Sequence, residues 1–329
     1  MAITMMQLAK EFENRKPMQS GHKLCPGCGA PLVARWALMV AEHLGYRPVI
    51  SFATGCMEVS SSTYPYSSWN VPYIHNAFEN SAATISGVET AYKALVKRGK
   101  IEDKKQVFFA FGGDGGTYDI GFQSLSGAVE RGHNFVYILY DNEGYMNTGN
   151  QRSGSTPPSS MTTTAPVGSA SVGKVQFKKN ITEAIAMHGR VYVAQASVAN
   201  PMDYFKKIEN AITFDGPAFV NVFSPCVRFW RVDPSQTRVV SQLALDTHYW
   251  PLYEVDRGIY KINYKPKNVK PVIEFMKAQG RFKNILKSKN ADEVVEKIQK
   301  EVDRRWNRLL RMEEATKDNP EEIMFDFGN

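Results

Sequence analysis

The sequence predicts an α/β fold in which a mainly parallel sheet carries helices on both faces. Short apolar runs alternate with segments of helical periodicity through the first two thirds of the chain. Repeated strand–helix–strand units of this kind form parallel sheets covered by helices. The 329 residues, of which 43% are hydrophobic and 22% charged, suffice for one large α/β core with extensions or for two modest domains.

The expected elements alternate in a regular order. Residues 106–111 are typical of the strands, because this apolar run stops abruptly at Gly112-Gly113. Residues 80–97 are typical of the helices, because small and apolar side chains recur there every three or four positions. On these criteria we expect strands at residues 47–54, 106–111, 135–140, 191–196 and 218–223, and helices at residues 80–97, 119–130 and 202–213.

Polar motifs follow the predicted strands. Cys56, Asp114, Asn142 and Cys226 each come shortly after a strand ends, and ligands of open α/β sheets bind beyond the carboxyl ends of the strands. A long polar segment, residues 142–173, also begins at such a point. A loop of this length inside a compact domain is either functional or disordered. Its composition is typical of disorder, but its position directly after a core strand favours function.

The chain divides into three expected segments. Residues 1–20 form an N-terminal extension, residues 21–230 the α/β domain, and residues 231–329 a C-terminal extension in which the alternation fades. The last part, residues 281–329, holds eleven basic and eleven acidic residues. One apolar stripe at helical spacing runs through it: Val294, Ile298, Val302, Trp306 and Leu309. The stripe predicts an amphipathic helix, either packed on its own domain or laid as an arm across a neighbouring subunit.

Composition and charge exclude several classes of protein. The formal net charge of +7 is spread out, without the Lys/Arg block typical of nucleic-acid binding. Residues 1–18 are charged and lack the apolar run of a signal peptide. No stretch approaches the ~18 uninterrupted apolar residues of a membrane span. We therefore expect a cytoplasmic protein that binds neither nucleic acid nor membrane.

The chain has four cysteines, each beside glycine or proline. Cys25 and Cys28 form a CxxC pair, Cys56 follows a predicted strand, and Cys226 lies far downstream. Four converging thiolates satisfy either tetrahedral zinc or a [4Fe–4S] cluster. Zinc usually takes two close pairs, whereas here one pair is joined by two isolated cysteines. The spacing alone leaves both open. Disulfides are disfavoured, because nothing marks the chain as secreted.

A glycine-rich motif follows the strand at residues 106–111. Residues 112–117 read Gly-Gly-Asp-Gly-Gly-Thr, and such small residues let backbone N–H groups approach a diphosphate at a helix N-terminus. Asp114 would repel phosphates unless a divalent cation lay between them, which predicts an Mg²⁺ ligand. The next strand ends at Asp141-Asn142-Glu143-Gly144, which offers the Asn142 side-chain oxygen and a backbone carbonyl near Gly144.

These motifs together resemble a known family. Gly113-Asp114-Gly115, followed by Asn142 28 positions after Asp114, resembles the thiamine diphosphate signature. The longer strings at residues 112–123 and 140–149 resemble the β subunit of pyruvate:ferredoxin oxidoreductase (pyruvate synthase), in the 2-oxo acid:ferredoxin oxidoreductase family. The cysteine-containing segments and residues 64–66 and 74–80 agree with that family. The resemblance is dense from about residue 20 to 230 and looser afterwards.

The resemblance implies the thiamine diphosphate-binding fold, with thiamine diphosphate, Mg²⁺ and a proximal [4Fe–4S] cluster as cofactors. By residue, it implies Cys25, Cys28, Cys56 and Cys226 as cluster ligands, and Asp114, Asn142 and the Gly144 carbonyl as Mg²⁺ ligands. It further implies that Gly113, Gly115 and Gly116 line the diphosphate and that Thr54, Gly55 and His75 lie near the thiamine rings, with Asn147 beside the reacting carbon. For His75, a purely structural role is nearly as well supported as substrate contact.

The resemblance also implies partners. Thiamine catalysis needs a glutamate on the aminopyrimidine ring, and Glu58, Glu79 and Glu89 are candidates by position only. In the family an α subunit supplies that glutamate and the substrate contacts, beside γ and ferredoxin-like δ subunits. The implied reaction uses pyruvate, coenzyme A and ferredoxin. Branched-chain 2-oxo acids, 2-oxoglutarate, aryl glyoxylates and oxalate are alternative substrates. A non-redox thiamine decarboxylase with structural zinc and a non-catalytic electron-transfer protein are the alternative functions.

Overall fold

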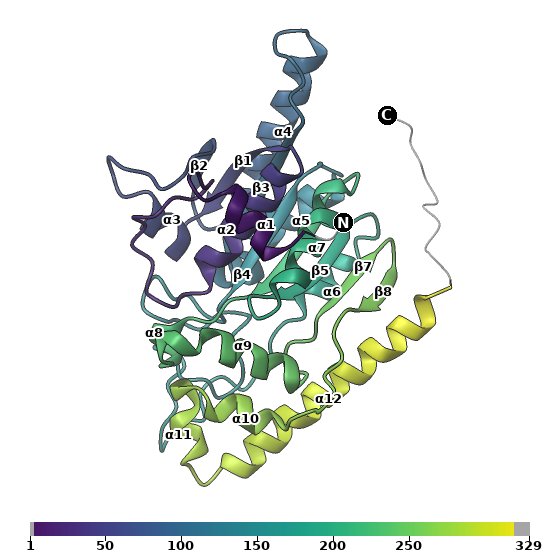
Figure 1. Cartoon of the computed structure of the whole chain (residues 1–329). Coiled ribbons are helices and arrows are strands. Elements are labelled where there is room, and N and C mark those ends of the chain that lie inside the picture. The colour runs from purple at the N-terminus through teal and green to yellow at the C-terminus, as the bar shows by residue number, and fades with distance from the viewer. Residues whose placement is uncertain (1–2, 319–329) are drawn as a thin grey trace.

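The computed structural model describes residues 3–318, and within them the chain forms one eight-stranded sheet (Figure 1). The strand order is β2-β1-β3-β4-β6-β5-β7-β8. The first six of these pair in parallel, and β7 and β8 add an antiparallel hairpin at one edge. The strands are β1 Arg47–Ala53, β2 Tyr73–Asn76, β3 Gln106–Gly113, β4 Val136–Asp141, β5 Tyr192–Ser197, β6 Ala218–Phe223, β7 Tyr253–Asp256 and β8 Ile259–Ile262. The mainly parallel sheet is confirmed.

Helices and helical turns connect these strands. They are α1 Met5–Glu11, α2 Ala30–His43, α3 Cys56–Ser61, α4 Ser81–Lys97, the π-helix η1 Gly115–Ile120, α5 Phe122–Glu130, α6 Ile181–Ala186, α7 Pro201–Thr213, α8 Val227–Trp230, the 3₁₀ turn η2 Pro234–Gln236, α9 Thr237–Asp246, α10 Val272–Lys277, the 3₁₀ turn η3 Gly280–Phe282, α11 Lys283–Leu286 and α12 Ala291–Thr316. Among residues 3–318 no helix combines the length and hydrophobicity that crossing a membrane requires.

The sheet buries a core on each face. Side chains alternate between the faces of a strand, and β3 shows the consequence. Phe109 and Phe111 pack in the cluster that includes α2 and α7, whereas Phe108 and Ala110 pack in the cluster that includes α4 and α5. Because both faces are apolar, β3 reads in the sequence as a continuous apolar run. Helices therefore cover both faces of the sheet, as predicted.

The helix expected at residues 119–130 begins differently. The chain first forms η1, in which Gly121 N donates to Gly116 O at 2.7 Å, five residues back, and α5 starts only at Phe122. The Thr117 hydroxyl donates to Gly113 O at 2.8 Å and ties this wide turn to the end of β3. A π-helical turn widens the backbone spiral and is frequent at functional sites.

The C-terminal extension packs on its own chain. In α12, Ile298 and Val302 are buried in a cluster with residues of α10 and α11, and Leu309 is buried in the cluster that contains β7 and β8. Glu313 accepts a hydrogen bond from the Ile262 backbone N–H of β8 at 2.7 Å. The apolar stripe is thus covered within the chain, which supports the first of the two interpretations of this helix. Figure 1 shows α12 running past α10 towards β8. The β7–β8 hairpin was not predicted, because its strands have only four residues each.

Candidate functional site

The candidate site lies where four neighbouring strands end. Strands β1, β3, β4 and β6 are adjacent in the sheet. Thr54 follows β1, Asp114 follows β3, Asn142 follows β4, and Cys226 comes three residues after the end of β6. Because these strands are parallel, their carboxyl ends meet at one edge of the sheet. The fold therefore gathers motifs from four separate parts of the sequence.

The Asn142 side-chain amide bridges two oxygen atoms at Asp114. One end of this amide lies 2.9 Å from Asp114 Oδ1 and 3.0 Å from the Gly144 carbonyl, and in the cation-free chain this end is the nitrogen, which donates to both. Ligand oxygens about 2.1 Å from an octahedral Mg²⁺ lie about 3 Å from one another. Turning the amide over gives an oxygen triplet whose spacing fits a shared Mg²⁺.

The electrostatics of Asp114 point to the same conclusion. Asp114 is 1% exposed. Burial, and then the nearby Asp141 carboxylate, raise the pKa of Asp114 well above its ordinary value. A buried carboxylate is costly unless a positive charge compensates it. The oxygen triplet thus matches a divalent cation in charge as well as in geometry.

The glycine motif packs tightly around Asp114. A Cβ on Gly116 would come within 2.8 Å of the Phe78 carbonyl, and a Cβ on Gly115 would overlap the Tyr145 ring. The cavity here measures about 30 Å³, which is room for only a few water molecules. It is lined by Thr54, Gly55, Cys56, Phe78, Gly113, Asp114, Gly115, Gly116, Tyr140, Asn142, Gly144, Tyr145, Met146, Asn147 and Thr148.

The four cysteines are free thiols and line one cavity of about 420 Å³. A turn in which Cys28 N donates to Cys25 O at 3.1 Å presents the CxxC pair. Gly29 N donates to Pro225 O at 3.4 Å and joins this loop to the segment that carries Cys226. Cys56 is the first residue of α3. The described residues contain no group of three His, Cys, Asp or Glu side chains placed to hold a single metal ion.

Burial makes three of the thiols, Cys28, Cys56 and Cys226, harder to ionise, because it raises the pKa of each. Burial raises the pKa of Cys28 to about 12 and that of Cys56 to about 12, and the other cysteines of the cavity add to both shifts. Burial also raises the pKa of Cys226. Metal coordination needs the thiolate, so these sulfurs become ligands only when a positively charged metal group compensates them.

The two cavities adjoin. Five residues line both of them: Cys56, Asn142, Met146, Asn147 and Thr148. The Asn147 side chain is exposed where the cavities meet. A group held by the cysteines would thus neighbour a group held by Asp114 and Asn142.

His75 lies at the edge of this region, on β2. Its Nδ1 is 2.5 Å from Glu58 Oε1, and its Nε2 is 3.4 Å from the Thr54 hydroxyl, which donates to the Asn76 carbonyl at 2.6 Å. The His75 side chain is 55% exposed and Glu58 only 5%. The contact with Thr54 brings His75 to the rim of the Asp114 cavity, but His75 does not line it.

The sequence did not point to several residues around Asp114. Within the polar segment of residues 142–173, the Ser153 hydroxyl donates to Asp114 Oδ2 at 2.5 Å and the Ser155 hydroxyl to Asp141 Oδ1 at 2.6 Å. Both serines are buried. The segment therefore packs over the strand ends. The length of the segment and its position directly after a core strand were the only signals for these contacts, because individual serines in a polar run look alike.

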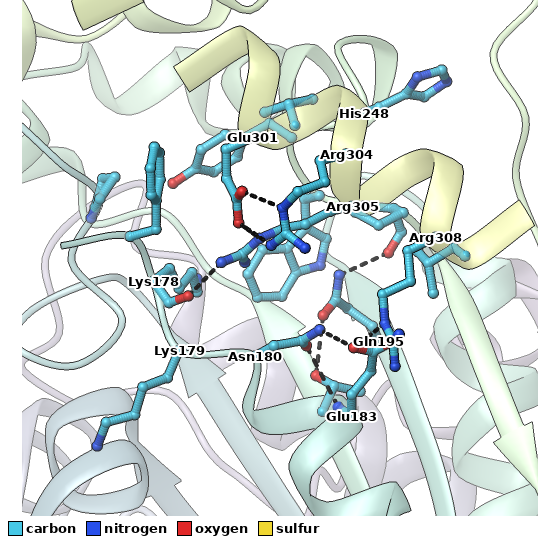
Figure 2. A pocket seen from close by; sticks show the side chains of 18 of the residues that line it. Lys178, Lys179, Asn180, Glu183, Gln195, His248, Glu301, Arg304, Arg305 and Arg308 are labelled. Carbon is cyan, nitrogen blue, oxygen red and sulfur yellow. Dashed lines mark hydrogen bonds and ion pairs between the residues drawn. The ribbon is translucent and has the colours of Figure 1, made fainter. Parts of the chain in front are cut away.

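A further cavity, of about 270 Å³, lies between α12 and the chain from Phe177 to Glu183 (Figure 2). None of the residues predicted for the site lines it. Three basic side chains of α12 border it, and all three are paired: Arg304 and Arg305 with Glu301, and Arg308 with Glu183.

Comparison with known proteins shows the family of this chain. Residues 53–222 match the family model described as thiamine pyrophosphate enzyme, C-terminal TPP binding domain. The chain is 63% identical to pyruvate synthase subunit PorB of Thermotoga maritima, over 97% of this chain and 99% of the relative. It belongs to the β subunits of the 2-oxo acid:ferredoxin oxidoreductases.

Other members of the family differ in their named substrate. Pyruvate synthase subunit PorB of Methanocaldococcus jannaschii is 48% identical, over 92% of this chain and 99% of the relative. Ketoisovalerate oxidoreductase subunit VorB of Pyrococcus abyssi is 42% identical, over 90% and 93%. A solved structure of 2-oxoglutarate:ferredoxin oxidoreductase from Magnetococcus marinus matches with a TM-score of 0.52 and 26% identity, over 70% of this chain and 81% of that chain. The chain is thus a subunit of a thiamine-dependent enzyme.

Proposed function

We propose that this β subunit binds the diphosphate end of magnesium thiamine diphosphate and a [4Fe–4S] cluster, in an enzyme that oxidises pyruvate with coenzyme A and ferredoxin. The products are acetyl-CoA, CO₂ and reduced ferredoxin, and the reaction is reversible. The observation that carries the proposal is the adjoining pair of cavities, one beside Asp114 and one lined by all four cysteines. When bound, thiamine diphosphate takes up the electron pair left by decarboxylation, and the cluster passes electrons on to ferredoxin.

The residues around Asp114 fit magnesium and a diphosphate. Asp114, the Asn142 side chain and the Gly144 carbonyl supply the oxygen ligands that Mg²⁺ prefers. Gly113, Gly115 and Gly116 supply backbone that phosphate oxygens can approach. The cavity of about 30 Å³ is smaller than a diphosphate, so residues around it must move apart when the diphosphate binds. Tyr145, whose hydroxyl donates to Gly115 O at 2.9 Å, forms part of its wall.

The cysteines fit a cluster better than zinc. Zinc at ~2.3 Å from each sulfur needs thiols that are nearly in contact, and the described residues contain no such group for a single ion. A [4Fe–4S] cluster holds its four sulfur ligands farther apart, and the cavity of about 420 Å³ has room for it. Zinc-dependent, non-redox chemistry is therefore the weaker alternative, also because the chain's relatives are named as synthases and oxidoreductases.

The remaining site residues act on the substrate end of the cofactor. Thr54 and Gly55 follow β1 and line the Asp114 cavity, where they would contact the thiamine rings, and the exposed Asn147 would lie beside the reacting carbon. The side chain of His75 is 55% exposed at the rim of this cavity and would be accessible to a partner chain.

An α subunit completes the site by supplying the activating glutamate. None of the three candidates in this chain is placed for that role. Glu58 is paired with His75, Glu89 is paired with Lys93 and His133, and Glu79 does not line the Asp114 cavity. The γ and ferredoxin-like δ subunits then carry electrons from the cluster to ferredoxin.

Pyruvate is the proposed substrate because the 63% identity to the Thermotoga maritima pyruvate synthase subunit covers nearly all of both chains. The test is anaerobic purification with the partner subunits, followed by viologen reduction across a panel of 2-oxo acids with coenzyme A. We expect the highest kcat/KM for pyruvate. A higher value for a branched-chain 2-oxo acid, 2-oxoglutarate, an aryl glyoxylate or oxalate would correct the substrate. Failure of every acid to support coenzyme A-dependent reduction would contradict the function itself.

A further inference from the structure

Glu143 lies between two of the proposed magnesium ligands and is itself fully buried, at 1% exposure. Its φ of 64° is in the left-handed region, which non-glycine residues rarely adopt. This turn aims the Asn142 side chain and the Gly144 carbonyl at Asp114. A strained conformation of this kind persists only where surrounding contacts enforce it.

Three side chains hold the Glu143 carboxylate. Arg281 Nη2 lies 2.5 Å from Oε2, Lys178 Nζ lies 3.2 Å from Oε1, and the Tyr249 hydroxyl donates to Oε1 at 2.6 Å. Both carboxylate oxygens of Glu143 are therefore fixed, one by Arg281 and the other by Lys178 and Tyr249.

The same cations reach the neighbouring ligand residues. Lys178 Nζ is 2.9 Å from Asp141 Oδ2, directly before Asn142. The Arg281 guanidinium stacks at 3.7 Å on the Trp230 ring, whose Nε1 donates to the Asn142 carbonyl at 3.0 Å. Asn142 is thus tied through its own carbonyl, and Glu143 through its carboxylate, to one buried group of side chains.

The two cations that hold Glu143 come from parts of the sequence far from β4, and each is fixed by its own neighbours. Arg281 belongs to η3, and its Nε donates to Gln279 at 2.8 Å. Lys178 is fixed from α12, because Arg305 Nη2 donates to the Lys178 carbonyl at 2.5 Å while Glu301 pairs with Arg305 at 2.6 Å (Figure 2). The Lys178 ammonium also lies 4.2 Å over the Trp250 ring.

We propose that Arg281 and Lys178 are positioning residues for the magnesium ion: they clamp the Glu143 carboxylate and so hold the Asn142–Gly144 turn in ligating geometry. This inference rests on the magnesium site proposed above. It gives the C-terminal extension a part in cofactor binding, although no residue of that extension lines the Asp114 cavity. Buried ion pairs contribute little to stability on balance, so geometric control is the better explanation for this one.

The test is a titration of the cofactor-stripped complex, assembled with its partner subunits, at fixed thiamine diphosphate. Retained cofactor is measured against Mg²⁺ and, separately, against Ca²⁺. Arg281→Met should raise the half-saturating Mg²⁺ concentration about 10- to 100-fold, as loss of an outer-sphere partner of a metal ligand does. It should also shift the preference towards Ca²⁺, because Mg²⁺ demands near-ideal octahedral geometry and Ca²⁺ does not. A loss of folding alone would not change this preference.

Two further variants complete the test, one as a milder change at Glu143 and one as a control. Tyr249→Phe removes one hydrogen bond from Glu143 and should shift Mg²⁺ dependence in the same direction, about two- to fivefold; it decides the question if Arg281→Met does not fold. The control is Arg308→Met. Arg308 lies on the same C-terminal extension and pairs with Glu183 of α6, and its loss should leave both titrations unchanged. If folded Arg281→Met, or Tyr249→Phe, keeps the Mg²⁺ dependence and ion preference of the wild type, the inference is wrong, but the proposed magnesium site still stands. Cofactor binding by the wild type without any divalent cation would overturn the magnesium site and the inference together.

Discussion

The cysteines that line the cavity of about 420 Å³ differ in their exposure to solvent. Cys25 is exposed in the turn of the CxxC loop, whereas Cys56 and Cys226 are half-buried and pack beside the aromatic cluster that contains Phe223 and Trp230. Solvent exposure and the groups around the sulfurs tune the potential of a cluster. The cysteine on the wall shared with the Asp114 cavity, Cys56, is therefore the most informative one to change.

Replacing Cys56 separates the two cofactors. Cys56→Ala removes one of four sulfur ligands but leaves Asp114, Asn142 and Gly144 intact, so we expect loss of iron and of brown colour with retention of thiamine diphosphate. The measurement is iron content and bound thiamine in the anaerobically assembled complex. Ser60→Ala changes a neighbouring side chain of the same cavity and should keep both cofactors. Full iron content and electron transfer in Cys56→Ala would refute the ligand assignment.

Asp114 illustrates a conflict between stability and function. Its pKa is raised by burial and by Asp141, so without a cation the charged carboxylate opposes folding. Asp114→Asn keeps the shape and removes the charge. We expect it to raise the free energy of unfolding of the cofactor-free chain by about 0.5–2 kcal/mol, measured by chemical denaturation.

The same substitution should abolish stabilisation by the cofactor. In the assembled complex, magnesium and thiamine diphosphate should raise the Tm of the wild type but not of Asp114→Asn. Asp256→Asn is the control, because Asp256 ends β7, pairs with Arg257 and lies outside the Asp114 cavity. A cofactor-induced rise in Tm that survives in Asp114→Asn would count against a magnesium ligand at this position.

At the scale of elements, the π-helix η1 explains why the motif after β3 is so rich in glycine. Its wide turn brings Gly116 against the loop before α4, where an added Cβ would lie 2.8 Å from the Phe78 carbonyl. Because the contact would be with backbone atoms, neither segment can relieve it by changing a side-chain rotamer. The glycine is thus required by close packing, since its φ is not in the left-handed region.

This packing predicts opposite effects for two glycine substitutions. Gly116→Ala should lower the free energy of unfolding by about 1–3 kcal/mol, as overpacking does, and weaken thiamine diphosphate binding. Gly87→Ala lies within α4 with open space around its Cβ and should raise stability by up to about 1 kcal/mol through helix propensity. Denaturant titrations of both variants check the pair. A neutral Gly116→Ala would show that η1 relaxes more easily than its packing implies.

The elements also show where the sequence sufficed for prediction. Strands β3, β4 and β6 were found because strands buried on both faces are continuous apolar runs. The hairpin of β7 and β8 was missed because four-residue strands carry little pattern. The ends of the predicted strands located Asp114, Asn142 and Cys226, whereas the clamp on Glu143 was not predictable. Its partners come from distant parts of the chain, Lys178 from a loop and Arg281 from the 3₁₀ turn η3, and only tertiary packing brings them together.

At the scale of the whole molecule, the proposed function makes this fold half of an active site. The residues proposed for magnesium and for the cluster line two adjoining cavities at one edge of the sheet, while His75 and Asn147 are exposed there. On the same proposal a partner chain supplies the side chain that activates the coenzyme. The subunit would then act as a cofactor-bearing surface, which that partner covers before chemistry occurs.

The central claim is that the four cysteines hold an iron–sulfur cluster beside this surface. Its most direct test is metal and sulfide analysis of the anaerobically purified wild-type chain, together with its visible absorption spectrum. We predict iron and inorganic sulfide in a one-to-one ratio and a brown protein. Stoichiometric zinc in a colourless protein, or four thiols that all react with a thiol reagent in the native state, would contradict it.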